Sequence, residues 1–499
     1  MTTDFVRNLD TPLIMLTKKD GLSLRDACNG GIFCTGQPGS GKTSGFGKII
    51  AGAFLRAGMG GVVCICKPTE LEAWKEYAKQ HGREHDLLEF GDGEGINFLD
   101  YILAGAGDDG ANRATDALMS IIDSSDKAAG QGGGKKGDEF WQQSSRQMIL
   151  YAVAALYGAT GTVRMQELIR FIDSAPTVKP TTREEQKALQ ETNYTVKTLR
   201  QMQNNPVREV AQDLREASIN YWLHQYPNLA PTTRSSIGIT VTAKLSRFNT
   251  GRLRKAFCDK TTILPEMTFA GKIILLNFPV LTMRQEGIVA QQLFSLLWMQ
   301  AVEGRNALPQ QFSDRPVFYY ADEAQFAIQP YLDLFLSVSR DCRASVILLT
   351  QSLATLYAQL GQDQSDFVDG LTGKFGQLVA CLNSCSRTNK FWSELCGKGM
   401  KIRKQISQSS TKQISTNRGG SAASTNEGFN RSDSSQEGSN EQEYETDLLP
   451  SNYFATQLKT GAVENNYEVT GVWFKAGGNF LEPIPETSSN ILLARFTQK

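Results

Sequence analysis

The chain has 499 residues, in which 52 Lys and Arg residues balance 52 Asp and Glu residues. A chain of this length predicts two or three domains and can bury a large core. The zero net charge excludes a globally basic nucleic-acid-binding protein, so any DNA contact must come from a local patch or from a pore shared by several subunits.

Cysteine spacing and hydropathy set further limits. The nine cysteines are scattered without metal-ligand spacing, which favours buried thiols in a reducing cytoplasm. Residues 1–10 lack the apolar core of a signal peptide. No uninterrupted apolar run reaches the ~18 residues of a membrane-spanning helix. We therefore expect a cytoplasmic protein with no membrane span of its own, peripheral at the inner membrane at most.

A phosphate-binding motif follows a lead-in segment, residues 1–30. The apolar run Gly31–Thr35 predicts a strand, the next residues match the Walker A pattern G-x-x-x-x-G-K-[ST], and a helix is predicted at Ser44–Leu55. We expect Lys42 to contact the β- and γ-phosphates of ATP and Thr43 to bind Mg²⁺. A chance glycine-rich turn is the alternative, which the flanking strand and helix disfavour. The predicted ATP-binding residues are Gly36, Gln37, Pro38, Gly39, Ser40, Gly41, Lys42, Thr43 and Ser44.

Strand and helix patterns then alternate as far as about residue 105. Strands are predicted at Gly60–Cys66 and Asp86–Phe90, with a helix at Glu70–Gln80 between them. This alternation is typical of a parallel sheet covered by helices. Residues 31–105 are thus expected to form the first part of an α/β nucleotide-binding domain.

Residues 106–230 contain no strand pattern and predict an all-α insertion domain. Ala128–Gly137 is rich in Gly and Lys and predicts a mobile loop. Helical spacing occurs at Asn112–Asp126, Phe140–Gly158, Arg164–Ser174, Thr182–Asn204 and Val207–Gln225.

The α/β pattern resumes in residues 231–400, the second part of the nucleotide-binding domain. The strand Pro316–Glu323 ends in two carboxylates, as in a Walker B motif. Asp322 would hold Mg²⁺ through water, and Glu323 would orient the water that attacks the γ-phosphate. An Asp-Glu pair is often only a turn, but the Walker A motif in the same chain favours catalysis. The other predicted elements are strands at Gly271–Phe278, Ala344–Gln351 and Gly376–Leu382 and a helix at Glu286–Gly304.

Three side chains flank the strand after the Walker B motif. Gln351 ends this strand and would lie beside the γ-phosphate; the alternative is a turn in which Ser352 caps the next helix. Arg340 and Arg343 precede the strand and are too far from their own P-loop. Either arginine could reach the phosphates of a neighbouring subunit, or be a solvated loop residue.

The C-terminal fifth of the chain changes in composition. Residues 405–445 are rich in Ser, Asn, Gln and Gly and nearly free of large apolar residues, which predicts disorder. Residues 446–499 regain apolar residues and are expected to dock on the ATPase domain.

The order and spacing of these blocks resemble the TraG/TraD kind of type IV secretion coupling protein, within the FtsK/HerA class of DNA-pumping ATPases. The resemblance covers roughly residues 30–400. The matching blocks are Gly36–Thr43, Val63–Leu71, Phe140–Trp141, Phe318–Phe326 and Ser339–Leu356.

The resemblance implies a RecA-like P-loop NTPase fold with a parallel-rich sheet and an inserted all-α domain. It also implies a homo-hexameric ring with ATP at the subunit interfaces and DNA in the channel. Such a ring hands DNA, or a DNA–relaxase complex, to a secretion channel. By position, Arg340 corresponds to a trans arginine finger and Gln351 to a γ-phosphate sensor.

Two features depart from the family. Its members usually begin with membrane-spanning helices, so this chain would dock on a separate membrane-anchor subunit or serve no secretion channel. Cys66 occupies a position where the family commonly has an acidic residue.

Two other functions stay open: a substrate-recruitment ring with a slow gating ATPase, and a phage or mobile-element DNA motor without a secretion channel. DNA contacts in a shared channel would come from basic side chains such as Lys135, Lys136, Arg252, Arg254 and Lys255.

Overall fold

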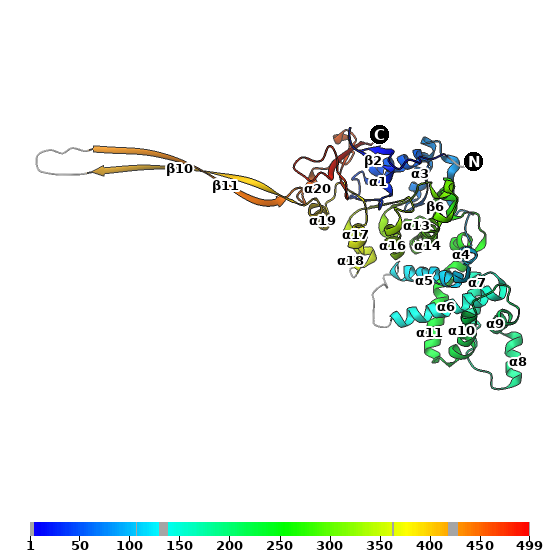
Figure 1. Cartoon of the computed structure of the whole chain (residues 1–499). Coiled ribbons are helices and arrows are strands. Elements are labelled where there is room, and N and C mark those ends of the chain that lie inside the picture. Colours follow the sequence, from blue (N-terminus) through cyan, green and yellow to red (C-terminus); the bar gives the residue numbers. More distant parts are fainter. Residues whose placement is uncertain (1–3, 106, 129–137, 362–363, 418–427, 499) are drawn as a thin grey trace, which may run out of the picture.

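The computed structural model describes residues 4–105, 107–128, 138–361, 364–417 and 428–498. These residues form a sheet domain, a helical domain below it and a long hairpin that projects from the sheet domain (Figure 1). Among the described helices, none is long and apolar enough by itself to cross a membrane. Two consecutive helices, Phe140–Thr160 and Met165–Asp173, are together long and apolar enough, but they meet at an angle of 115°.

A nine-stranded sheet with the order β13-β12-β9-β3-β8-β7-β4-β6-β5 forms the centre of the sheet domain. Neighbours from β9 to β5 pair in parallel, whereas β12 pairs antiparallel with both β9 and β13. The predicted α/β fold with a parallel-rich sheet is confirmed. The strands are β3 (Ile32–Thr35), β4 (Gly60–Cys64), β5 (Leu87–Phe90), β6 (Ile273–Leu276), β7 (Val317–Asp322), β8 (Ala344–Thr350), β9 (Gln377–Ala380), β12 (Glu468–Lys475) and β13 (Ile491–Thr497).

Helices cover both faces of this sheet, because alternate residues of the buried strands point to opposite sides. In β3, Ile32 and Cys34 join one apolar core, and Phe33 joins the other. The first core is covered by α1 (Leu24–Cys28), α2 (Lys48–Arg56) and α3 (Pro68–Gln80), together with the small hairpin of β1 (Pro12–Met15) and β2 (Gly21–Ser23). The second is covered by α14 (Gln285–Gly304), α16 (Pro330–Val338), α17 (Leu353–Leu360), α18 (Ser365–Thr372) and α19 (Ser386–Cys396).

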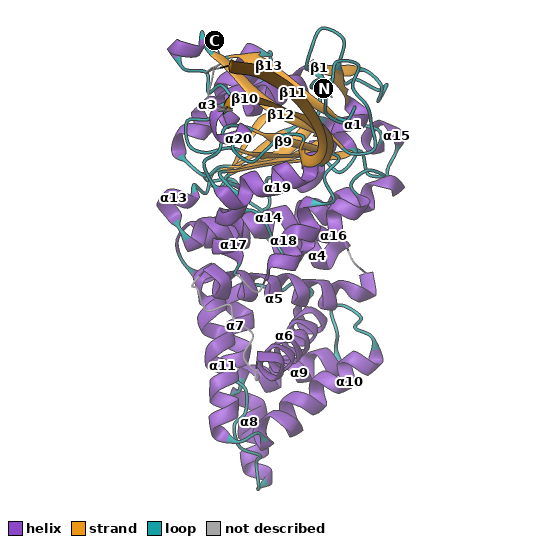
Figure 2. Ribbon diagram, turned by 90° about the vertical axis from the view of Figure 1, so that its left-hand side faces the viewer, coloured by secondary structure: helices purple, strands orange, loops and turns teal. Residues whose placement is uncertain are grey.

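The helical domain lies at the far end of the molecule from the sheet (Figure 2). The long helix α6 packs against α5, α9 and α10, and their apolar residues continue the second core of the sheet domain. The helical elements run on to Asp259, past the boundary at residue 230 that the sequence predicts. The helices are α4 (Phe98–Gly105), α5 (Gly110–Ala128), α6 (Asp138–Thr160), α7 (Met165–Asp173), α8 (Arg183–Thr192), α9 (Tyr194–Asn204), α10 (Gln212–Asn220), α11 (Pro231–Leu245) and α12 (Gly251–Arg254).

The segment 405–445, predicted to be disordered, differs from that prediction in the structure. Most of it belongs to an antiparallel hairpin of β10 (Lys398–Asn417) and β11 (Gly428–Asp447), which extends far from the sheet domain (Figure 1). Backbone hydrogen bonds between two strands need no apolar core, so a polar composition does not exclude this structure. The connecting residues 418–427 lie outside the described residues.

Candidate nucleotide site

Three chain segments meet at one edge of the sheet. Parallel pairing places Thr35 of β3 beside Thr350 of β8, and Asp322 of β7 beside Leu349. The P-loop, the Asp322–Glu323 pair and Gln351 therefore all follow the carboxyl ends of adjacent strands, where open α/β sheets bind ligands. The structure brings together these predicted residues.

The P-loop has the backbone conformation that its glycines permit. Gly39 and Gly41 have φ angles of +77° and +83°, which L-residues with side chains rarely adopt. A side chain on Gly36 would overlap the Ser40 hydroxyl. The helix that follows starts with a π-helical turn, Lys42–Gly47, before α2. Backbone N–H groups at this helix start can bind an anion.

Lys42 and Thr43 contact the acidic pair directly. The Thr43 hydroxyl donates a hydrogen bond of 2.6 Å to Asp322 Oδ2. Lys42 Nζ lies 3.5 Å from Asp322 Oδ1 and 3.8 Å from Glu323 Oε1. Thr43 and Asp322, the two residues expected to bind magnesium, therefore lie next to the ammonium group that would contact the terminal phosphates.

Glu323 is held by four side chains. Lys42 and Lys67 each have Nζ 3.8 Å from Oε1. The Gln351 amide lies 3.1 Å from Oε1 and 3.2 Å from Oε2, and the Gln325 amide donates to Oε2 at 3.0 Å. Glu323 itself has a left-handed φ of +61°, a strained conformation of the kind that clusters at functional sites.

Lys42 and Glu323 stabilise each other in the charged form. Burial alone would raise the pKa of Glu323, but Lys42 and the two glutamine amides outweigh it and lower this pKa. Burial would lower the pKa of Lys42, but Asp322 and Glu323 raise it. Glu323 is thus an anion able to accept a hydrogen bond from water, and Lys42 is a cation available to phosphate.

Glu70 is a further acidic group beside this site that the sequence analysis did not identify. Its carboxylate accepts hydrogen bonds from the backbone N–H groups of Cys66 and Lys67, at 2.7 and 3.3 Å. Burial and the negative charge of Asp322 raise the pKa of Glu70 to about 7, against these backbone hydrogen bonds. Its position at the start of α3 gives it a capping role.

The residues of the P-loop fit a bound nucleotide with magnesium. The Ser40 hydroxyl is buried without a hydrogen-bond partner among the described residues, although it lines a cavity of about 320 Å³ beside the P-loop. Within the described parts of the chain, no group of three or more His, Cys, Asp and Glu side chains could hold a metal on its own. Mg²⁺ at Thr43 and Asp322 would take its other ligands from phosphate and water, as Mg²⁺ commonly does.

The two arginines before β8 differ in their surroundings. Arg343 is bound to Asp314, with Nη2 3.1 Å from the carboxylate and Nη1 2.9 Å from the backbone carbonyl. Arg340 is exposed and makes no ion pair or side-chain hydrogen bond with any described residue. The seven residues of β8 separate both arginines from the sheet edge that carries the P-loop, a distance of roughly 20 Å.

The basic side chains proposed for DNA contact are partly engaged within the chain. Arg252 donates to the carbonyls of Gly91 and Asn277, at 3.2 and 2.9 Å, and Arg254 pairs with Asp259 at 3.3 Å. Lys255 is exposed. Lys135 and Lys136 lie outside the described residues.

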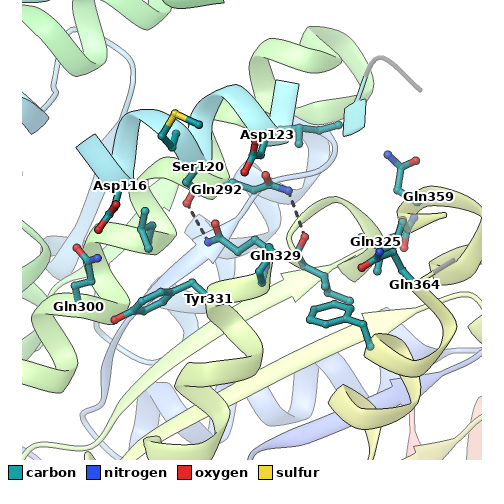
Figure 3. A pocket seen from close by; sticks show the side chains of 17 residues that line it. Asp116, Ser120, Asp123, Gln292, Gln300, Gln325, Gln329, Tyr331, Gln359 and Gln364 are labelled. Carbon is teal, nitrogen blue, oxygen red and sulfur yellow. Dashed lines mark hydrogen bonds between the residues drawn. The ribbon is translucent and has the colours of Figure 1, made fainter. Parts of the chain in front are cut away.

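Gln325 connects the site to a second cavity. It lies in the wall of a cavity of about 400 Å³ between α5 of the helical domain and α14, α16 and α18 of the sheet domain (Figure 3). Its amide nitrogen binds Glu323, and its carbonyl oxygen accepts a hydrogen bond from Thr350 at 3.2 Å. Gln325 was not predicted from the sequence, because in this motif only the acidic pair carries a recognisable chemical pattern, although Gln325 lies within a block that carries the resemblance.

The chain is similar to conjugation proteins. The family model "Type IV secretory system Conjugative DNA transfer" matches residues 9–427. No curated protein sequence matches the chain.

Solved structures of the coupling protein TrwB have a similar fold. An unbound TrwB form is 13% identical, with a TM-score of 0.56, and the match covers 100% of this chain and 90% of that chain. TrwB with the ATP analogue ADPNP is 14% identical, with a TM-score of 0.55 and coverage of 100% and 91%. TrwB with ADP and Mg²⁺ is 13% identical, with a TM-score of 0.56 and coverage of 100% and 90%.

Proposed function

Because the chain belongs to the type IV secretory system conjugative DNA transfer family, we propose that it hydrolyses Mg-ATP and uses this reaction to drive DNA toward a secretion channel. The observation that carries the proposal is the arrangement of Lys42, Thr43, Asp322 and Glu323 at one sheet edge. TrwB, a protein of the same fold, has been solved with ADPNP and with ADP and Mg²⁺.

Each side chain has a distinct part in hydrolysis. Glu323 orients a water molecule and takes a proton from it while the water oxygen attacks the γ-phosphorus, and this proton leaves with the phosphate product. The bond from that phosphorus to the oxygen of the β-phosphate breaks, and ADP and phosphate leave. Lys42 neutralises charge on the β- and γ-oxygens, and Gln351 lies where it could sense the γ-phosphate. Thr43, and Asp322 through water, would hold Mg²⁺, which when bound would neutralise further phosphate charge.

The site needs one more cation, and a neighbouring subunit can supply it. Arg340 is exposed and unpaired among the described residues, whereas Arg343 is held by Asp314. Arg340 is therefore the better candidate for a finger that inserts into the next subunit's site. In the assembly that we propose, ATP lies at the interfaces of a homo-hexameric ring at the inner membrane, with DNA in the channel and relaxase, channel and membrane-anchor subunits as partners.

ATP turnover measured with and without single- and double-stranded DNA tests this function. A DNA-driven motor should hydrolyse ATP faster when DNA is present, and Lys42→Ala should remove both basal and stimulated rates. If neither kind of DNA changed the rate of ATP hydrolysis, the proposed translocation would be contradicted and a recruitment ring would be favoured. Rates that survive in Lys42→Ala would overturn the nucleotide site itself.

A further inference from the structure

The P-loop cavity has a second wall that the Walker motifs do not contain. Gly39–Ser44 form one side, and Thr460–Ala462 with Gln498 form the other. We propose that this C-terminal wall is the ribose and base subsite of the nucleotide site. The proposal rests on the proposed ATPase function and deepens it, because it assigns a part of the substrate that the Walker residues do not contact.

The C-terminal wall is packed directly onto the P-loop. The methyl groups of Val469 fill the space beside Gly41, where an added Cβ would lie 2.7 and 2.8 Å from them. Phe496 of β13 packs edge-on against Phe46, with ring centroids 4.8 Å apart. The Gln498 amide donates a hydrogen bond to the Ser44 hydroxyl. The wall therefore has a fixed place relative to the phosphate-binding loop.

Backbone hydrogen bonds fix the two lining segments to each other. Gly461 N–H donates to the Glu468 carbonyl at 2.9 Å, and Tyr467 N–H donates to the Ala462 carbonyl at 3.1 Å. Gln498 N–H donates to the Tyr467 carbonyl at 2.7 Å. Thr460–Ala462 and Gln498 thus form one preorganised surface, which limits the ordering cost of binding a ligand.

The chemistry of this surface suits a nucleoside. Lys42 and Thr43 already face the acidic pair at the phosphate end, so a nucleotide held there must extend its sugar along the remaining wall. One N–H of the Gln498 amide binds Ser44, and the second N–H and the carbonyl oxygen remain as a donor and an acceptor for a ribose hydroxyl or a base edge. Among the described residues that line the cavity there is no aromatic ring for stacking, so we expect little discrimination between adenine and guanine.

Calorimetric titration of the full chain with Mg-ATP and with Mg-tripolyphosphate separates the two subsites. Gln498→Ala should raise the dissociation constant of ATP about three- to tenfold, the loss expected for one hydrogen bond, and leave that of tripolyphosphate unchanged. The matched control is Gln457→Ala, an exposed glutamine of the same C-terminal segment. Unchanged ATP affinity in Gln498→Ala would overturn the subsite.

A second measurement locates the base directly. Photolysis of bound 8-azido-ATP should label peptides that contain Thr460–Ala462 or Gln498, and unlabelled GTP should suppress this labelling at concentrations similar to those of ATP. Labelling confined to other segments would overturn the proposal. Failure of both ATP and tripolyphosphate to bind the unmodified chain would instead overturn the nucleotide site, so the two failures are distinguishable.

Discussion

Glu323 owes its position to its neighbours, because its left-handed backbone angle is unfavourable for a residue with a side chain. Two amides and two ammonium groups direct its carboxylate toward the P-loop. A glutamine in its place would keep the shape and lose the negative charge that polarises water.

Glu323→Gln should therefore bind Mg-ATP with near-normal affinity and hydrolyse it slower by about 10²–10⁴-fold, the range of general-base catalysis. Stopped-flow binding of a fluorescent ATP analogue measures the affinity, and steady-state phosphate release measures the hydrolysis rate. If Glu323→Gln abolished binding while Asp322→Asn had no effect, the roles assigned to these carboxylates would be reversed.

Lys42 is buried between the acidic pair and the phosphate cavity, so its removal leaves two carboxylates facing the phosphates. Lys42→Ala should abolish hydrolysis and weaken ATP binding, because the cation on the terminal phosphates is lost. Isothermal titration and phosphate release measure both effects. Lys48→Ala is a control from the same helix, outside the residues that line the cavity; turnover near normal in Lys42→Ala would contradict the P-loop assignment.

The pKa of about 7 for Glu70 gives the free protein a pH-dependent stability. The folded state binds this proton more tightly than the unfolded state, in which a glutamate pKa is about 4.3. The contribution of Glu70 to the free energy of unfolding is therefore largest at low pH and is lost as the pH rises toward 7 and above.

Glu70→Gln should flatten the dependence of stability on pH between about 5 and 7, because the amide does not titrate. Urea unfolding midpoints across that range measure the effect. Glu72→Gln, an exposed change on the same helix, is the control. An unchanged slope in Glu70→Gln would show that another group is responsible.

At the scale of elements, the hairpin β10–β11 can be shortened at a defined register. Arg403 pairs with Gln442, so deletion of Ser407–Glu441 joins Ile406 to Gln442 and leaves residues 404–406 as a short turn. ATPase activity and melting temperature should be essentially unchanged, because the deleted segment contains too few large apolar residues to contribute to a core. A large fall in melting temperature in a thermal scan would contradict this independence.

Sequence patterns predicted the apolar strands that lead directly into a nucleotide-binding motif. The strands β3, β7 and β8 are continuous apolar runs that end in Thr35, Asp322 and Thr350, so the edge carrying the site could be located in advance. The parallel order of these strands then brought the predicted groups together.

The elements that were missed lack such a local signal. Nothing in Thr460–Ala462 or Gln498 resembles a phosphate motif, and they reach the P-loop only because β12 and β13 add to the edge of the sheet beyond β9. The hairpin was missed because its composition lacks apolar residues, whereas its strands pair through the backbone. Such long-range pairings are not encoded in local periodicity.

For the whole molecule, the strongest test of assembly is complementation between two inactive variants. Arg340→Ala should fold and bind ATP normally, but it should be inactive alone because every interface lacks the finger. Mixed with Lys42→Ala, it should regain part of the turnover, since interfaces that pair an intact P-loop with Arg340 reappear. Arg343→Ala is the matched control, because its side chain is held by Asp314 in its own subunit. Full activity of Arg340→Ala, independent of protein concentration, would indicate a self-contained monomeric ATPase.

The hairpin also determines the hydrodynamic character of the protein. Its 20-residue strands span roughly 65 Å at the usual rise per residue, whereas a compact chain of this length has a radius of gyration of only about 23 Å. The chain must therefore tumble and diffuse as an elongated particle, although most of its mass is compact. In a ring, each subunit would add an arm that enlarges the radius within which the assembly can collide with another macromolecule, without enlarging the ATPase body.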